Sequence, residues 1–187
     1  MKVLLDACVL YPTVLREILL AVARRGGFTP LWSARILEEW ARAARKIGPT
    51  GEAQARAEIA LLRAAWPGAE VAPKAGLEAR LWLPDPNDVH VLAAAIAGGA
   101  DLLLTFNARD FPGHLLAEEA LRRAAPDAFL MDLWLAGPDP VEAAVAEVHA
   151  AAERIAGEAL ERRALLKRAR LPRLGKALNE VLNKARD

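Results

Sequence analysis

Short apolar runs alternate along the chain with longer segments in which apolar residues recur three and four positions apart. The short runs predict buried strands, because a strand of a parallel sheet is covered on both faces. Such strands are expected at 2–6, 28–32, 69–71 and 101–106, with a further edge strand at 129–133. The longer segments predict helices at 12–25, 34–47, 52–66, 74–83, 85–98 and 114–124. Strands separated by helices indicate an α/β fold in which a central parallel sheet has helices on both faces.

The alternation ends at the sequence Gly137-Pro138-Asp139-Pro140. From there a helical pattern continues to the end of the chain, with one interruption at Pro172. We therefore expect a sheet domain over residues 1–135 and a C-terminal helical extension, or appendage, over residues 138–187.

The net charge is +1 for 187 residues, so the chain as a whole has no large excess of positive charge that would favour nucleic acid binding. Any basic site must be local, and residues 154–187 hold ten Arg or Lys against four Asp or Glu. One interpretation is that these basic side chains bind RNA phosphates or an acidic partner. The plainer interpretation is that they are solvated on helices that cover the core. The residues concerned are Arg162, Arg163, Lys167, Arg168 and Arg170.

The single cysteine, Cys8, excludes an internal disulfide and favours a reducing compartment, so a cytoplasmic location is expected. No apolar stretch approaches the roughly 20 residues that a membrane-spanning helix needs. A secretory signal peptide is not expected either, because the first apolar run is short and ends at the charged Asp6.

Four acidic residues stand close to the points where predicted strands end or predicted helices begin. They are Asp6, Glu39, Asp88 and Asp110. Sites in open parallel sheets form outside the carboxyl ends of the strands, so we expect these carboxylates at one crevice. Like charges gather only where a positive group offsets their repulsion, and Mg²⁺ and Mn²⁺ prefer hard oxygen ligands. The sequence therefore predicts a divalent-metal site.

Two of these acids have an acidic neighbour that competes for the same role. Glu39 lies at the margin of the apolar face of its helix, whereas Glu38 points nearly opposite and is expected in solvent. Asp85 is expected to cap the following helix, which leaves Asp88 as the site residue. Two plainer interpretations stay open: Asp6 as the cap of the next helix, and Glu39 as an ordinary boundary residue.

The segment that follows the fourth predicted strand holds further candidates. Thr105 is placed to hydrogen-bond a carboxylate, and Asn107 offers a metal a neutral oxygen. Arg109 is either a phosphate contact or a surface charge, and the stretch around it is also typical of an Asn-initiated turn. His90 is expected to point away from the apolar face of its helix and is not assigned as a ligand. Cys8 is expected to be a small buried hydrophobe.

Four stretches of the sequence, taken in order, resemble the PIN domain, and in particular its branch of VapC-like toxin ribonucleases. They are Val3-Leu4-Leu5-Asp6, Ser33-Ala34-Arg35-Ile36-Leu37-Glu38-Glu39-Trp40, Asp85-Pro86-Asn87-Asp88 and Thr105-Phe106-Asn107-Ala108-Arg109-Asp110-Phe111. Each motif alone is weak, whereas four in this order are fairly specific. The resemblance covers about residues 1–135.

This resemblance implies a three-layer α/β/α fold and Mg²⁺- or Mn²⁺-dependent cleavage of RNA. The acidic quartet of the family falls on Asp6, Glu39, Asp88 and Asp110 of this chain. Asp6 and Asp88 would hold the metal directly, and Glu39 and Asp110 would complete its shell or orient the attacking water. Many relatives have an aspartate where this chain has Asn107. The family also implies a homodimer, and an antitoxin protein that blocks the acidic crevice, often with a basic side chain.

Two other classes of protein compete with this interpretation. A phosphatase of the haloacid dehalogenase type also has an aspartate after its first strand, but it needs a second aspartate two residues later, where this chain has Cys8. The stronger rival is a PIN-like scaffold that binds RNA or protein without cutting. The four acids argue against such a scaffold, and Asn107 argues for it. The sequence therefore favours a metal-dependent endoribonuclease, the toxin of a toxin–antitoxin pair.

Overall fold

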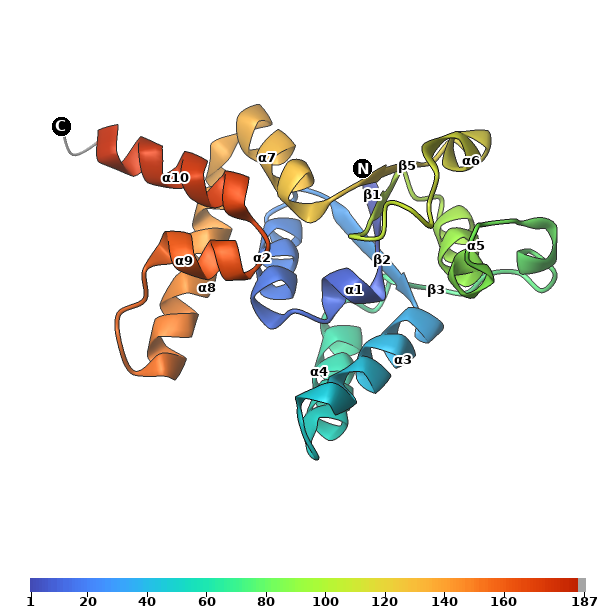
Figure 1. The fold of residues 1–187 in the computed structure, drawn as a ribbon, viewed down its shortest axis with the longest axis horizontal. Helices are drawn as coiled ribbons and strands as arrows, with labels where there is room; N and C mark the ends of the chain where they lie inside the picture. The colour runs from blue at the N-terminus through green and yellow to red at the C-terminus, as the bar shows by residue number, and fades with distance from the viewer. Residues whose placement is uncertain (185–187) are drawn as a thin grey trace. The chain divides into compact units, whose positions relative to one another are not determined.

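The computed structural model of the chain describes residues 1–184, with side chains described through residue 180. The chain divides into two compact units (Figure 1). The first, which we call the sheet unit, comprises Met1–Tyr11 and Phe28–Ala124. The second, which we call the helical unit, comprises Pro12–Gly27 and the chain from Ala125 onward.

A five-stranded sheet in the order β3-β2-β1-β4-β5 forms the centre of the sheet unit, and all of its strand pairs are parallel. The strands are β1 (Lys2–Leu5), β2 (Thr29–Ser33), β3 (Glu70–Val71), β4 (Leu102–Leu104) and β5 (Arg122–Ala124). Val3, Leu4 and Leu5 are fully buried, as the apolar run predicts for a central parallel strand. The predicted central parallel sheet is therefore confirmed.

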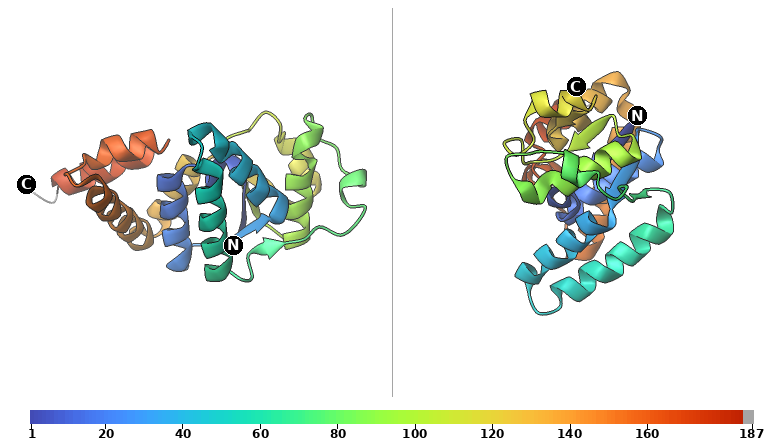
Figure 2. Two further views of the ribbon diagram at one scale, coloured as in Figure 1. Left: turned by 90° about the horizontal axis from the view of Figure 1, so that it is seen from below. Right: turned by 90° about the vertical axis from the view of Figure 1, so that its right-hand side faces the viewer.

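The strand order places helices on both faces of the sheet. Parallel crossovers are almost always right-handed, and the chain moves outward from β1 to β2 and then β3 before it returns across the sheet to β4. This reversal puts α3 (Ala34–Ala43) and α4 (Gly51–Ala65) on one face and α5 (Val89–Gly98) on the other. Figure 2 shows α5 and α4 on opposite sides of the strands. The three-layer α/β/α architecture is thus confirmed, and the point where the strand order reverses lies between β1 and β4.

Helix α5 lies close against the sheet because glycine permits it. A Cβ atom at Gly98 would come within 2.8 Å of Leu31 and 3.1 Å of Val71, so a larger residue would push the helix away from β2 and β3. The next residue, Gly99, ends the helix with φ +60°, a left-handed conformation that favours glycine. The predicted stop at these two glycines is confirmed, and it fixes the position of the acidic segment that precedes α5.

The first turn of α3 is held by Ser33, whose hydroxyl oxygen accepts a hydrogen bond from the backbone N–H of Ile36 at 3.2 Å. Serine is a favoured residue at this capping position, and Ile36 and Trp40 are buried on the apolar face of the helix. The helix tightens into the 3₁₀ turn η1 (Ala44–Ile47), which leaves Ile47 exposed although the sequence placed it on that face.

Several sequence-based boundaries were wrong for identifiable reasons. The helix predicted at 74–83 is reduced to the 3₁₀ turn η2 (Glu78–Arg80), and the helix predicted at 114–124 divides into α6 (Gly113–Glu118) and strand β5. The edge strand predicted at 129–133 lies in helix α7 (Pro126–Ala136), because a short apolar run does not separate a buried strand from a buried helix. The predicted start at Asp85 holds, but the first turn is the 3₁₀ turn η3 (Pro86–Asp88).

The helical unit is assembled from two separate stretches of the chain. Helix α2 (Thr13–Arg24) packs on α8 (Pro138–Ala156), α8 packs on α7, and α9 (Arg162–Arg168) packs on α10 (Pro172–Lys184). The carboxylate of Asp127 accepts hydrogen bonds from the backbone N–H groups of Arg173 and Leu174 at 3.0 and 3.1 Å, so it caps α10 from the first turn of α7. The unit therefore includes α2 and α7 in addition to the predicted extension 138–187, of which residues 185–187 lie outside the described part.

Among the helices that the structure describes, none combines the length and the apolar character needed to cross a membrane.

Candidate metal centre

The reversal point of the sheet brings together the ends of β1 and β4. Asp6 follows β1, and its backbone N–H donates to the carbonyl oxygen of Leu104, the last residue of β4, at 3.1 Å. Thr105 follows β4 directly. Crevices at such reversal points are where open parallel sheets bind ligands.

The side chain of Asp6 is turned toward this crevice and does not cap the short helix α1 (Ala7–Leu10) that follows it. Its Oδ2 atom accepts hydrogen bonds from the hydroxyl of Thr105 at 2.6 Å and from the thiol of Cys8 at 3.1 Å. The residue is 8% exposed. The interpretation of Asp6 as a simple helix cap is therefore excluded, and the predicted hydrogen bond of Thr105 to a carboxylate is confirmed.

Cys8 is half-buried and lies at the crevice instead of in the core. Burial raises the pKa of its thiol to about 12, and the nearby charge of Asp6 adds to the rise. The thiol therefore stays protonated at neutral pH and acts as a hydrogen-bond donor to Asp6.

Three aspartates converge in front of α5. Carboxylate oxygens of Asp85, Asp88 and Asp110 all lie within 4.8 Å of one another, and all three residues are half-buried. Asp88 makes no capping hydrogen bond with its side chain, whereas Asp85 accepts one from the backbone N–H of Asn87 at 2.9 Å. Asp85 is thus the predicted cap and also a member of the cluster, a second role that the sequence did not suggest.

Asp88 is the centre of the negative charge. Burial raises its pKa from 3.8 to about 6, and the charges of Asp6, Asp85, Asp110 and Glu39 contribute to the rise in that order. A carboxyl group surrounded by four others accepts either a proton or a cation, because both offset the repulsion. Oxygen ligands in this number fit a hard divalent cation such as Mg²⁺ or Mn²⁺.

Asn107 moderates this charge. Its side-chain amide donates to Oδ2 of Asp88 at 3.2 Å, and its backbone N–H donates to the hydroxyl oxygen of Thr105 at 3.0 Å. An aspartate at this position would add another charge beside Asp88. The departure from the pattern of many relatives therefore lowers the repulsion in the crevice.

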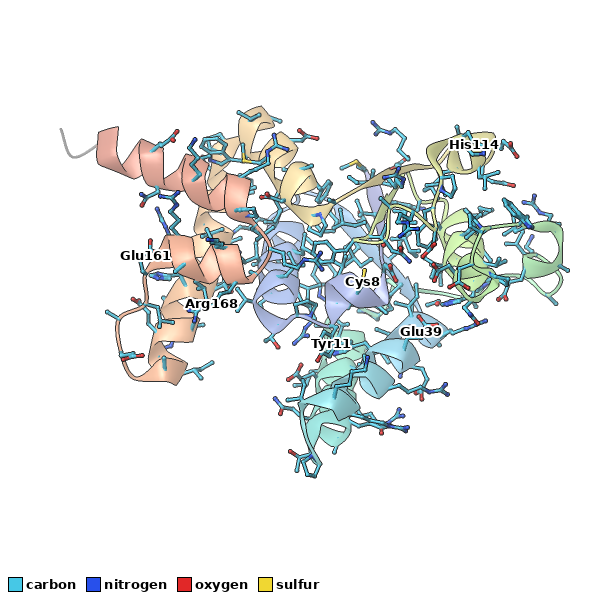
Figure 3. All side chains as sticks on the ribbon, in the orientation of Figure 1. Cys8, Tyr11, Glu39, His114, Glu161 and Arg168 are labelled. Carbon is cyan, nitrogen blue, oxygen red and sulfur yellow. The ribbon has the colours of Figure 1, made fainter. Side chains whose placement is uncertain are left out.

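Glu39 approaches from helix α3, where Figure 3 labels it together with Cys8 on α1. Its Oε1 atom lies 2.7 Å from Nε2 of His90 and 3.8 Å from Nε of Arg35. His90 is 2% exposed, so the expectation that its side chain points away from the apolar face of α5 was wrong. Val91, Leu92 and the alanines that follow are buried as well, which leaves this helix without a polar face at that position.

Glu38, the neighbour of Glu39, belongs to a separate network between α3 and α4. Its carboxylate accepts hydrogen bonds from Arg42 at 3.0 Å and from Arg56 at 2.9 and 3.0 Å. These arginines hold the pKa of Glu38 down at about 2. The expectation that Glu38 lies apart from the acidic crevice agrees with this arrangement, although Glu38 is paired and not simply solvated.

A family model described as the PIN domain matches residues 2–109. This chain belongs to the PIN domain family. The match includes Asp6, Glu39, Asp85 and Asp88, and Asp110 is the first residue beyond it. No curated protein and no solved structure matches the chain. PIN domains are generally metal-dependent nucleases, and the aspartate cluster of this one is a possible metal site.

The predicted quartet of this PIN domain is only partly drawn together. Asp88 and Asp110 belong to the tight cluster, and Asp6 and Glu39 act on Asp88 through their charges. Asp6 is also hydrogen-bonded to Thr105, and Glu39 contacts His90. Sequence reasoning missed Asp85 and His90. Asp85 stands three residues before Asp88 with a proline between them, a spacing that could have indicated two carboxylates on one tight turn.

The predicted RNA-binding residues lie in both units: Arg109 in the sheet unit, and the others on α9 or in the turn after it. Arg109 is exposed in the turn before Asp110, and no acidic partner is found for it among the described residues. Arg163, Lys167 and Arg168 are exposed on α9, where Figure 3 labels Arg168. The remaining two predicted residues, Arg162 and Arg170, are placed differently from these three. Arg162 donates to the carbonyl oxygen of Leu178 at 3.3 Å, and Arg170 lies in the turn after α9 with φ +63°.

The sheet unit also has a hollow of about 360 Å³ between the start of α3 and the end of β3. His90 and Arg35, the two residues that contact Glu39, both line it. Its walls also include Val71 and Pro73, and Glu78 at its rim is 3.6 Å from Arg35. Its lining holds two carboxylates, those of Glu70 and Glu78, together with the guanidinium of Arg35.

Proposed function

We propose that this PIN domain protein is a Mg²⁺- or Mn²⁺-dependent endoribonuclease that hydrolyses RNA phosphodiester bonds. The observation that carries the proposal is the convergence of Asp85, Asp88 and Asp110 within 4.8 Å at the reversal point of the sheet. Carboxylates this close together repel one another, and a cation or a proton among their oxygens offsets that repulsion. Family membership adds the expectation of nuclease chemistry.

The side chains of the crevice would have different roles in metal binding and catalysis, according to their positions. Asp88, Asp110 and Asp85 would hold the cation together with Asp6, whose carboxylate Thr105 and Cys8 orient. Glu39 would complete the shell or orient the attacking water. One or two divalent ions in such a site supply a nucleophilic water and neutralise charge on the attacked phosphate and the leaving oxygen.

The substrate would lie across the crevice and the hollow beside it. Arg109 is exposed next to Asp110, and its guanidinium would contact a phosphate. The hollow lined by Val71, Pro73 and His90 would take a nucleobase next to the cleaved bond. Contacts of both kinds are usual for single-stranded RNA, because phosphates supply affinity and bases pack against side chains.

The test is a cleavage assay on single-stranded RNA with Mn²⁺, with and without a chelator. Cleavage by the wild-type protein should require the metal, and Asp88→Asn should abolish cleavage while the protein stays folded. Glu158→Gln, in the loop before α9, serves as a matched control that lies outside the sheet unit. Metal-independent cleavage, or full activity of Asp88→Asn, would contradict the proposal.

A second candidate is a catalytically weak or inactive PIN-like scaffold that binds RNA or protein. Asn107 favours it, because the amide donates to Asp88 where many relatives place a further acid. The same assay separates the two candidates: a scaffold would bind RNA and show no metal-dependent cleavage. Asn107→Asp would be expected to raise cleavage by a weak enzyme and leave a true scaffold inactive.

The toxin role is proposed on the resemblance to the VapC-like branch. An antitoxin would insert a basic side chain into the acidic crevice, and a small reading frame directly upstream of the gene would support it. A cytoplasmic location is proposed with it, since the chain has one cysteine. A homodimer is proposed because such relatives usually pair. Light scattering at micromolar concentration tests the dimer, and a monomer would contradict it.

A further inference from the structure

The imidazole of His90 is buried without a good hydrogen bond. The residue is 2% exposed, and neither ring nitrogen makes a hydrogen bond to another described residue. Burying a polar group without a partner is costly, so buried polar groups in proteins are usually hydrogen-bonded. Nε2 nevertheless lies 2.7 Å from Oε1 of Glu39, which is within hydrogen-bond distance and makes this carboxylate the acceptor at hand.

The contact engages one oxygen of Glu39 and leaves the other available. Oε1 has His90 at 2.7 Å and the more distant Arg35 at 3.8 Å. No described residue pairs with Oε2. Arg35 is the weaker partner, because its side chain is 52% exposed and it also lies 3.6 Å from Glu78. The orientation of the carboxylate therefore depends mainly on His90.

His90 also stands two residues after Asp88, at the start of α5. The ring that holds Glu39 on α3 and the carboxylate at the centre of the cluster are thus fixed to the same turn of chain. A side chain that joins Glu39 to this turn sets the distance between Glu39 and Asp88. Partners of this kind are known to orient metal-binding carboxylates and to tune their affinity.

We propose that His90 is a positioning residue, whose Nε2–H holds the carboxylate of Glu39 with its second oxygen directed to the cation-binding crevice. The inference rests on the proposed function, because it assigns Glu39 to the shell of the metal. The alternative is that His90 only fills space in the core under α3, in which case any residue of similar volume replaces it.

The test compares His90→Leu, which keeps most of the volume and removes the donor, with His90→Gln, whose amide nitrogen reaches about as far as Nε2. Mn²⁺ affinity is measured by calorimetry on the full chain. His90→Leu should weaken it by about 10–100-fold, the usual effect of losing a partner of a metal-binding side chain, and His90→Gln should restore most of the loss. In a Glu39→Gln background, His90→Leu should cause no further loss.

Two results would overturn the proposal: wild-type Mn²⁺ affinity in His90→Leu, or an equal loss from His90→Leu in the Glu39→Gln background. Should His90→Leu fail to fold, His90→Asn takes its place, because its amide is too short to reach Glu39. NMR of the imidazole nitrogens separates this inference from the proposed function. In Glu39→Ala, which removes the acceptor, the chemical shift of Nε2 should change even in a protein that binds no metal. An unchanged chemical shift would refute the hydrogen bond between His90 and Glu39.

Discussion

The hydroxyl oxygen of Thr105 lies 2.6 Å from Oδ2 of Asp6, although 99 positions separate the two residues in the chain. The hydrogen bond joins the residue that follows β1 to the residue that follows β4. Because the thiol of Cys8 donates to the same oxygen, Oδ2 is occupied and Oδ1 is the atom that a cation would meet. Thr105 thus sets which oxygen of Asp6 faces the crevice.

Replacing Thr105 by Val should destabilise the protein and weaken Mn²⁺ binding. The change keeps the shape and removes the donor from a carboxylate that is 8% exposed, which typically costs about 1–3 kcal/mol of unfolding free energy. Denaturant unfolding and calorimetry measure the two effects. Thr105→Ser is the matched control and should remain close to wild type; equal losses in both variants would show that packing of the methyl group matters instead.

Glu39→Gln should abolish RNA cleavage with the fold intact, whereas Glu38→Gln should leave cleavage nearly unchanged. The two residues are adjacent on α3, but Glu39 contacts His90 and Glu38 contacts Arg42 and Arg56. Initial rates on the same RNA, with circular dichroism as the control for folding, compare the variants. The reverse order of effects would mean that Glu38 and not Glu39 serves the site.

Asp85→Asn separates the two roles of Asp85. Asparagine caps a helix about as well as aspartate, so the thermal stability should be preserved. The cluster loses one charged ligand, and Mn²⁺ affinity should fall by about tenfold or more. An unchanged affinity by calorimetry would leave Asp85 as a cap alone.

Metal-free protein should become less stable as the pH rises from about 4 to about 6. The pKa of Asp88 is raised to about 6 in the folded state, so the folded protein retains a proton in this range that the unfolded chain has released. Stability from this group is complete below its ordinary pKa and is lost as the pH rises through its folded pKa. Urea unfolding in chelator at several pH values measures the trend, and Asp88→Asn should remove it.

Mn²⁺ affinity, in contrast to the stability of the metal-free protein, should rise with pH. The cation competes with the proton for Asp88, so the affinity should increase up to a pH of about 6 and change little above it. Calorimetry across this range tests the prediction. An affinity independent of pH would show that Asp88 does not bind the ion.

RNA affinity should fall with added salt, and basic residues of α9 should contribute to the slope. Deleting the chain after Leu135 is unsuitable as a test, because it removes α8 from α2. We therefore expect Arg163→Ala and Arg168→Ala each to lower the salt slope by about one unit where the residue contacts a phosphate. Lys176→Ala on α10 is the control. Unchanged salt slopes in the Arg163 and Arg168 variants would show that α9 serves only in packing.

The sequence predicted the central parallel strands and the helices that begin at Ser33 and Asp85 because each rests on a local pattern. Val3 to Leu5 form a continuous apolar run, and Ser33 precedes an amphipathic helix, so strand and cap follow from neighbouring residues. The helix at 126–136 was missed because its apolar run fits either element, and packing in the helical unit decides between them.

The role of His90 could not be predicted for a different reason. Its significance comes from Glu39, fifty-one positions earlier in the chain and on another helix. Helical periodicity describes faces of one helix, and α5 is buried on nearly every side at this point. Only the tertiary structure, which brings Glu39 of α3 to His90 of α5, shows that these two polar groups meet.

The helical unit holds α2 near the start of the chain and α8 near its end, and this spacing affects synthesis on the ribosome. Chains grow by about 5–20 residues per second, so α2 waits on the order of ten seconds before α8 emerges to cover it. During that interval its apolar face is open to chaperones and to other nascent chains. A product that terminates before α8 keeps this face uncovered permanently, which favours degradation over the release of a shortened protein with an intact acidic crevice.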